Sequence, residues 1–211
     1  MASLADIRKD YILHSLSEKD IAADPFRQFA IWWQEAETAE ILEVNAMTLA
    51  TASAEGVPSA RIVLLKGYDE RGFVFFTNYE SYKGKDMLEN PRACLVFFWK
   101  ELERQVRITG IIEKVSAIES AEYYNSIPEG SRIGAWVSPQ SQTIEGREWL
   151  EENERKYKEM FADKPITRPA HWGGYRVKPV KIEFWQGRSS RLHDRIQFTL
   201  QETGSWQIER L

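Results

Sequence analysis

The chain has 211 residues, of which 43% are hydrophobic and 28% charged, with a net charge of −4. This composition excludes a disordered chain, favours one domain, and argues against a nucleic-acid-binding surface, which usually leaves a basic imprint. One cysteine and three histidines leave no disulfide or metal cluster to expect, and no apolar run approaches the ~20 residues that span a bilayer, so we expect a cytoplasmic protein without a membrane partner.

The sequence of the N-terminal part predicts a polar arm followed by a helix. Residues 1–20 are mixed and polar, and we expect the single domain to cover 21–211. Asp24-Pro25 is typical of a helix start, with aspartate as the N-cap and proline in the first turn. Apolar side chains then recur at helical spacing to about Glu40.

From Asn45 onward the pattern is mainly that of short strands joined by tight turns. We expect strands over 47–52, 60–66, 73–77, 93–99, 105–115, 174–185, 194–200 and 206–211, and helices over 81–90, 117–126 and 145–161. Around seven strands with inserted helices predict a mainly β fold with flanking helices, closed or nearly closed into a barrel. No alternating βαβ pattern or glycine-rich nucleotide loop is present.

The stretch 185–195 has the strongest chemical signal. If 191–195 is extended, Arg191, His193 and Arg195 share one face of a strand. Such a face favours an anionic ligand, a phosphate or a carboxylate. The alternative is a solvated edge strand whose charge is balanced by Asp194 and nearby acids.

Three other stretches carry weaker signals. Arg61 and Lys66 flank an apolar strand with opposite parity, so they serve different parts of a site, or a bulge re-aims one, or both simply reach solvent. Residues 77–84 combine hydroxyls, Lys83 and a helix start, which suits either a phosphate cradle or a plain N-cap. Residues 134–142 are small and amide-rich, as in a ligand-edge contact or a simple loop.

Nucleophilic catalysis has no support in the sequence. There is no G-x-S-x-G elbow with a base nearby. Cys94 lies in an apolar strand and reads as a core residue.

Taken together and in order, these stretches resemble the pyridoxamine 5′-phosphate oxidase family. The matching pieces are Arg61-Ile-Val-Leu-Leu-Lys66, Phe76-Thr-Asn78, Glu103-Arg-Gln-Val106, Ile133-Gly-Ala-Trp136, Ser138-Pro-Gln-Ser141, Trp172-Gly-Gly-Tyr175, Glu183-Phe-Trp-Gln-Gly187, Arg191-Leu-His-Asp-Arg195 and Glu209-Arg-Leu211, with Arg8, Tyr11 and Asp24-Pro25 before them. The likeness covers nearly the whole chain.

The resemblance implies a split β-barrel homodimer with two FMN sites at the subunit interface. The reaction that the resemblance implies is oxidation of pyridoxamine or pyridoxine 5′-phosphate to pyridoxal 5′-phosphate, with O2 as electron acceptor and H2O2 as by-product. The small phosphorylated B6 vitamers and O2 are then the partners, and the cofactor carries the difficult chemistry.

The resemblance also implies roles for individual residues. The FMN contacts are expected from Arg61, Ile62, Val63, Leu64, Phe76, Thr77, Tyr82, Lys83, Gln105, Gln140, Ser141, Trp185 and Arg195. The substrate contacts are expected from Lys66, Tyr123, Ser131, Arg191, Leu192 and His193, with Arg191 and His193 over the reacting side as the catalytic pair. Arg8 and Tyr11 would close over the substrate as a lid; the alternative is a terminus without fixed structure.

Two positions depart from the family pattern. Tyr82 and Ile127 stand where family members usually have arginines, one expected at the FMN phosphate and one at the substrate phosphate. Each loss is worth about 10- to 100-fold in binding if uncompensated, and Arg132 is a candidate replacement. We therefore predict altered phosphate selectivity. Two competing readings are a flavin- or pyridoxal-phosphate-binding protein with slow turnover, and another split-barrel flavin or haem enzyme.

Overall fold

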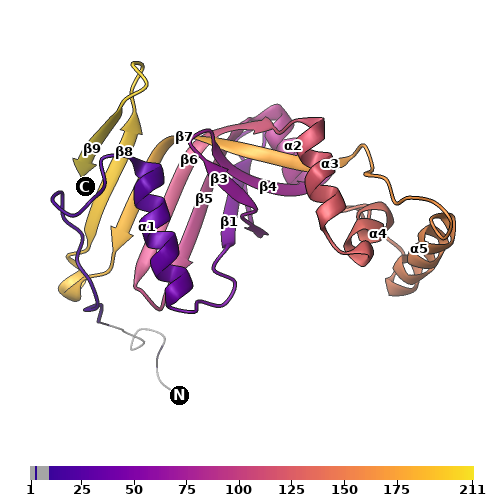
Figure 1. The fold of residues 1–211 in the computed structure, drawn as a ribbon, viewed down its shortest axis with the longest axis horizontal. Coiled ribbons are helices and arrows are strands. Elements are labelled where there is room, and N and C mark those ends of the chain that lie inside the picture. The colour runs from indigo at the N-terminus through magenta and orange to yellow at the C-terminus, as the bar shows by residue number, and fades with distance from the viewer. Residues whose placement is uncertain (1–2, 4–9) are drawn as a thin grey trace.

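The part of the chain that the structure describes forms one antiparallel sheet of nine strands with helices on its faces and at one end (Figure 1). The computed structural model describes residue 3 and residues 10–211. The main strand order is β2-β1-β5-β6-β7-β4-β3, and β8 pairs with β7 and β9. The strands are β1 (Ala46–Ala52), β2 (Pro58–Leu64), β3 (Gly67–Asp69), β4 (Gly72–Asn78), β5 (Arg92–Trp99), β6 (Arg104–Lys114), β7 (Trp172–Gln186), β8 (Asp194–Leu200) and β9 (Trp206–Arg210).

Among the described residues, five α-helices accompany the sheet: α1 (Pro25–Thr38), α2 (Tyr82–Glu89), α3 (Ala117–Ser126), α4 (Glu129–Val137) and α5 (Arg147–Met160). Side-chain caps explain where three of them begin, because each cap satisfies a backbone N–H of the first turn. Asp24 accepts from Arg27 N, Ser81 from Gly84 N, and Ser116 from Glu119 N. In the described part of the chain, no helix is long and apolar enough to cross a membrane.

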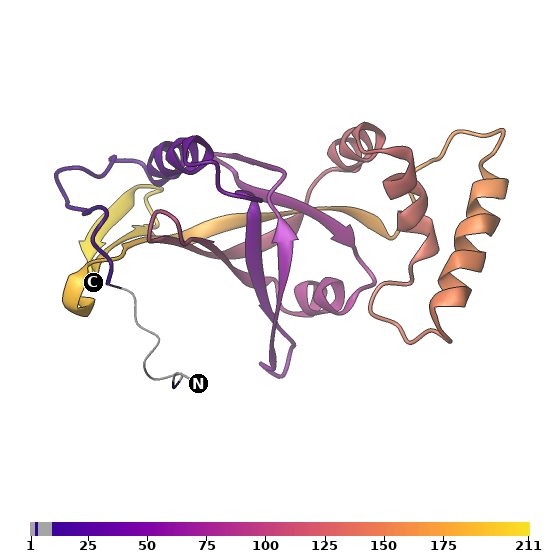
Figure 2. The ribbon, with the colours of Figure 1, turned by 90° about the horizontal axis from the view of Figure 1, so that it is seen from below.

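The main core lies between α1 and the sheet. Phe29 and Trp32 of α1 are buried against Phe73, Phe97 and Phe184 of the strands. A second, smaller cluster joins α3, α4 and α5 around a short set of buried residues, namely Tyr124, Ile133, Val137 and Ile166. The helices of the second cluster, α3, α4 and α5, lie beyond one end of the sheet (Figure 2).

The structure confirms the mainly β fold with flanking helices and corrects some details. The described residues form nine strands where about seven were expected: eight overlap the expected ranges, and β3 is the strand that was not expected. Residues 134–137 belong to α4, whereas a loop was one of the two interpretations of residues 134–142 from the sequence. Cys94 is half-buried on the opposite face of β5 from the core, so its interpretation as a core residue was wrong.

Residues 191–195 are not extended throughout, so the condition for a shared strand face of Arg191, His193 and Arg195 is not met. A short 3₁₀ turn, Ser189–Arg191, precedes β8, and Ser190 and Arg191 have left-handed φ values of 55° and 61°. The strand begins only at Asp194. Simple alternation therefore does not put Arg191 on the strand face that Arg195 occupies.

The face of the sheet opposite α1 exposes apolar side chains. Ile62 is 64% exposed, Phe98 55% and Leu64 37%. These residues lie on β2 and β5, which are joined through β1. Contiguous apolar exposure of this kind marks an interaction surface. We call this side of β1, β2, β5 and β6 the open face.

Candidate functional site

A buried cation forms the centre of the first group of site residues. The ammonium of Lys83, on α2, lies 3.1 Å from Gln140 Oε1 and 3.3 Å from the hydroxyls of Thr77 and Ser81. All three partners are neutral, and Lys83 is 8% exposed. Burial lowers the pKa of Lys83, and the nearby charge of Arg61 lowers it further. We call these four residues the Lys83 cradle.

Arg61 brings a second cation toward the Lys83 cradle. Its guanidinium donates to Leu49 O at 3.1 Å, to Thr51 Oγ1 at 2.8 Å and to Ser59 Oγ at 2.6 Å. Burial lowers its pKa too, although the charge of Asp86 partly opposes that effect. The cross-strand register of β1 and β2 places Arg61 opposite Leu49.

The cradle is chemically suited to an anion. No carboxylate lies within 4 Å of the Lys83 ammonium among the described residues. A buried cation without an anionic partner is unfavourable on its own. A phosphate placed there would accept charge-assisted hydrogen bonds, so these residues fit a phosphorylated cofactor.

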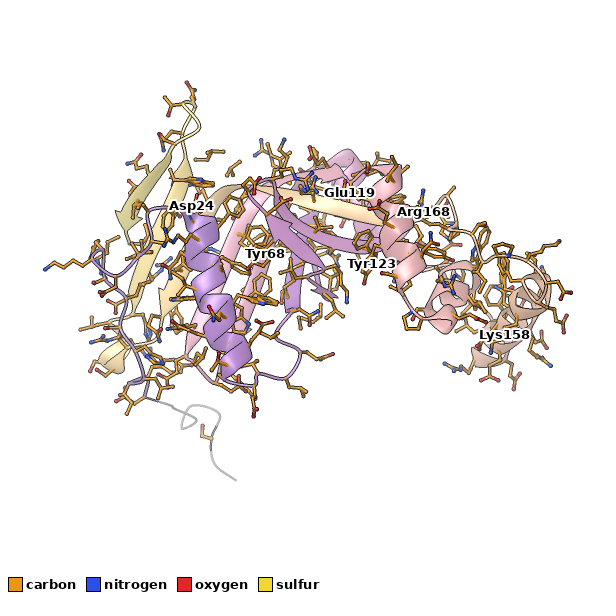
Figure 3. All side chains as sticks on the ribbon, viewed as in Figure 1. Asp24, Tyr68, Glu119, Tyr123, Lys158 and Arg168 are labelled. Atoms are coloured by element: carbon orange, nitrogen blue, oxygen red, sulfur yellow. The ribbon has the colours of Figure 1, made fainter. Side chains whose placement is uncertain are left out.

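A hollow of about 310 Å³ lies between β3, β4 and α3. Lys66, Phe76 and Tyr123 line it. The rings of Phe76 and Tyr123 stack with centroids 3.9 Å apart, and Figure 3 shows Tyr123 together with Glu119 on α3. Phe76 and Thr77 are neighbours on β4, and successive side chains of a strand point to opposite faces, so the hollow and the cradle lie on opposite sides of this strand.

The second group of residues forms a single rung across three strands. Gln105 of β6 pairs with Trp185 of β7, which pairs with Arg195 of β8. Arg195 donates to Glu183 at 3.1 and 3.3 Å, and Arg107 donates to the same carboxylate. Glu183 is 3% exposed and so fixes two arginines at once.

His193 and Tyr11 complete the second group. The His193 ring lies 4.7 Å from the Trp185 ring, and its Nδ1 accepts from Arg188 N at 3.0 Å. Tyr11 lies 5.8 Å from Trp185 and 5.9 Å from His193, measured between ring centroids. Arg8 lies outside the described residues.

The two groups occupy opposite ends of β7. Thr77 pairs with Gly173 near the start of this strand, and Gln105 pairs with Trp185 near its end. These β7 positions are twelve residues apart, which corresponds to about 40 Å along an extended strand. In Figure 1, β7 runs from beside α3 to β8. One chain therefore does not bring all the predicted residues to one place.

The remaining predicted residues are spread over the surface of both groups. Ile62, Leu64, Lys66, Tyr82, Ser131, Gln140, Ser141, Arg191 and Leu192 are exposed, and Val63 packs against the main core. Tyr82 is 68% exposed at the start of α2 and is absent from the contacts of the Lys83 cradle. Ile127 packs into the helical cluster, and Arg132 lines a different hollow from Lys66, between α4 and α5.

Sequence reasoning gave no role to Glu103 and Glu183. Both are buried carboxylates beside predicted site residues. Glu103 lies in the turn before β6 and Glu183 on β7, and their partners are far away in sequence, so no local signal was available. Only the matching pieces that contain them pointed to these positions.

The fold and these two groups define a split β-barrel protein with an anion cradle and an open face. Residues 34–160 match the pyridoxamine 5′-phosphate oxidase family, and residues 172–211 match the pyridoxine 5′-phosphate oxidase C-terminal dimerisation region. The chain belongs to the pyridoxine/pyridoxamine 5′-phosphate oxidase family and is an oxidoreductase of that family, as the sequence resemblance predicted.

Relatives match over essentially the whole chain. The pyridoxine/pyridoxamine 5′-phosphate oxidase of Cupriavidus necator is 60% identical over 211 residues, covering 100% of this chain and 99% of the relative. That of Bordetella pertussis is 59% identical over 209 residues, covering 99% of each. That of Trichormus variabilis is 57% identical, covering 99% of this chain and 98% of the relative.

Solved structures agree on the fold. PhzG from Burkholderia lata, in complex with tetrahydrophenazine-1-carboxylic acid, has a TM-score of 0.87 and 26% identity, covering 94% of this chain and 98% of its own. A pyridoxamine 5′-phosphate oxidase-related, FMN binding protein from Nostoc punctiforme has a TM-score of 0.72 and 16% identity, covering 90% and 99%. The split-barrel prediction is confirmed.

Proposed function

We propose that this protein oxidises pyridoxamine 5′-phosphate and pyridoxine 5′-phosphate to pyridoxal 5′-phosphate with FMN as cofactor. The observation that carries the proposal is the buried Lys83 ammonium, which faces neutral oxygens and shares its surroundings with Arg61. A phosphate supplies the missing negative charge. The names of the full-length relatives support the choice of substrate.

The chain's own residues bind and orient the two ligands. Lys83, Thr77 and Arg61 would hold the FMN phosphate, and the rung of Gln105, Trp185 and Arg195 would lie against the flavin. When bound, FMN supplies acceptance of a hydride equivalent from the C4′ carbon and delivery of the electrons to O2, which becomes H2O2. Glu183 keeps the Arg195 guanidinium in place through two hydrogen bonds.

The substrate would lie between the hollow and the loop before β8. Lys66 is placed to meet its phosphate, and Tyr123, already stacked on Phe76, offers a ring face to the pyridine. Arg191 and His193 would approach the reacting carbon, and closure over the ring would exclude water from the site. Ser131 and Leu192 complete the proposed contacts.

The proposed site needs two chains. The cradle and the rung lie at opposite ends of β7, and the open face carries exposed apolar side chains. The match of residues 172–211 to a dimerisation region supports a homodimer. We propose that the open faces of two protomers meet, so that the cradle of one faces the rung of the other and two FMN sites lie at the interface. The division into an arm (1–20) and one domain (21–211), and the cytoplasmic location, stay predictions.

The direct test uses the purified protein loaded with FMN. After addition of pyridoxamine 5′-phosphate in air, we expect pyridoxal 5′-phosphate and H2O2 in equal amounts, measured by absorbance and by a peroxidase-coupled assay. Arg147→Ala, an exposed change on α5, is the matched control and keeps full activity. Stable flavin binding without product would favour a binding protein instead.

A further inference from the structure

A buried glutamate holds the N-terminal arm against the second group of site residues. Glu103 lies in the turn between β5 and β6 and is 1% exposed. Its Oε2 accepts hydrogen bonds from Ile12 N at 2.9 Å and from Leu13 N at 3.1 Å. Carboxylates make strong hydrogen bonds to backbone N–H groups, so this contact fixes the chain direction just after Tyr11.

The backbone of Glu103 supports a role for its side chain. Its φ is +56°, in the left-handed region where glycine is the favoured residue. A glutamate there costs conformational energy, and such costs persist where the side chain serves a purpose. Turn formation by itself gains nothing from a glutamate at this position.

The same residue also sets the surface on which Tyr11 rests. The carbonyl of Glu103 accepts from Gly187 N at 2.8 Å. A Cβ atom on Gly187 would lie 2.7 Å from Tyr11 Cγ, so only glycine allows the ring this close. Glu103 therefore holds Gly187 with its main chain and the arm with its side chain, and Tyr11 lies between the two.

The rest of the arm is fastened elsewhere. Leu16 N donates to Asp194 Oδ2 at 3.0 Å, and Arg210 donates to Leu16 O and to the Glu18 carboxylate. These contacts hold residues 16–18 without Glu103. In the described part of the arm, the Glu103 carboxylate therefore accepts hydrogen bonds at residues 12 and 13, next to Tyr11, which meets Trp185 and His193.

We propose that Glu103 is a positioning residue for the oxidase reaction: it holds Tyr11 over Trp185 and His193, so that the arm forms one wall of the substrate site. This inference rests on the proposed function for its kinetic consequence only. The docking itself is a property of the chain and is measurable without substrate.

The experiment compares Glu103→Gly with wild type. The change removes the carboxylate, and glycine adopts the left-handed backbone conformation of this position without strain. We therefore expect the variant to fold. By hydrogen–deuterium exchange of the FMN-loaded protein, we expect the amides of Ile12 and Leu13 to exchange at least about 10-fold faster, with Leu16 unchanged. We expect KM for pyridoxamine 5′-phosphate to rise about 3- to 10-fold, with kcat within about twofold.

Two further variants make the result specific. Glu101→Ala removes an exposed glutamate from the same turn and should change neither readout. Tyr11→Ala should raise KM, and adding Glu103→Gly to it should raise KM no further, because both act through one ring. If Glu103→Gly fails to fold, Glu103→Gln, which keeps one acceptor oxygen, should give faster exchange at the same two amides.

Unchanged exchange at Ile12 and Leu13, or KM effects of Tyr11→Ala and Glu103→Gly that multiply, would overturn the inference. Failure of the proposed function gives a different pattern. The amides of Ile12 and Leu13 would still respond to Glu103→Gly, while wild type would release no peroxide from the B6 substrate.

Discussion

The ammonium of Lys83 and the amide oxygen of Gln140 lie 3.1 Å apart and join α2 to the loop after α4. The contact pairs a buried cation with a neutral acceptor. Such an arrangement is weak as a structural brace, because the charge loses hydration without gaining an opposite charge. The buried Lys83 ammonium becomes favourable when an anion binds beside it. The predictions on cofactor binding follow from this dependence on a bound anion.

Lys83→Met should lower FMN affinity by about 10- to 100-fold, the loss expected for a charge-assisted hydrogen bond. The melting temperature of the FMN-free protein should stay the same or rise, because the variant removes an unpaired buried charge. Titration of flavin fluorescence and thermal unfolding measure the two effects. Lys85→Met, on the exposed side of the same helix, is the control and should change neither.

As the pH is raised, FMN affinity should begin to fall at a lower pH than it would if Lys83 had the pKa of an ordinary lysine. The pKa of Lys83 is lowered from 10.5 by burial and by Arg61. Lys83 therefore loses its proton below pH 10.5, and the phosphate then loses its cationic partner. In the FMN-free protein, the unfolded chain binds more protons in the window between the lowered pKa and 10.5, so stability rises with pH there. Affinity measured from pH 7 to 10.5 should decline in wild type and be flat in Lys83→Met. Parallel profiles would contradict this assignment.

Arg191→Ala should lower kcat/KM for pyridoxamine 5′-phosphate by about 10- to 100-fold, the value of one charged contact. FMN affinity should not change, because Arg191 is exposed in the turn before β8 and lies outside both the cradle and the rung. Steady-state kinetics and flavin titration separate the two quantities. An equal loss of FMN affinity would place Arg191 at the cofactor instead.

Ile127→Arg tests how the missing arginine affects selectivity for the phosphate. We expect the ratio of kcat/KM for pyridoxamine 5′-phosphate to that for pyridoxamine to rise about 10-fold or more. Ile127 packs against the α4–α5 cluster, so Ile127→Met controls for altered packing and should leave the ratio unchanged. Arg132 lines another hollow, beside Lys158 and Lys164, which argues against its acting as a substitute. A wild-type ratio as high as that of Ile127→Arg would refute the predicted selectivity.

Local chemistry made part of the fold predictable from sequence. Asp24 and Ser81 cap helices where expected, because capping depends on residues only three positions apart. The helix α4 was missed because its sequence contains Gly130 and Gly134, which disfavour helix formation. It forms because Ile133 is buried against the neighbouring helices.

The site was predictable as a set of residues but not as a geometry. The ordered motifs identified Thr77, Lys83 and Gln140, and the structure joins these three through hydrogen bonds. The left-handed turn at Arg191 and the contact of Glu103 with the arm depend on interactions that alternation and spacing do not encode.

We propose that two chains share each oxidase site, and subunit mixing tests this arrangement most directly. Lys83→Met, at a cofactor concentration where it is inactive, and Arg191→Ala are each expected to be nearly inactive alone. When they are unfolded together and refolded as a mixture, half of the dimers combine one chain of each kind, and each such dimer has one site with both residues intact. If each site combines residues of both chains, the mixture should recover about a quarter of wild-type peroxide release. A mixture no more active than the average of the two variants would contradict it.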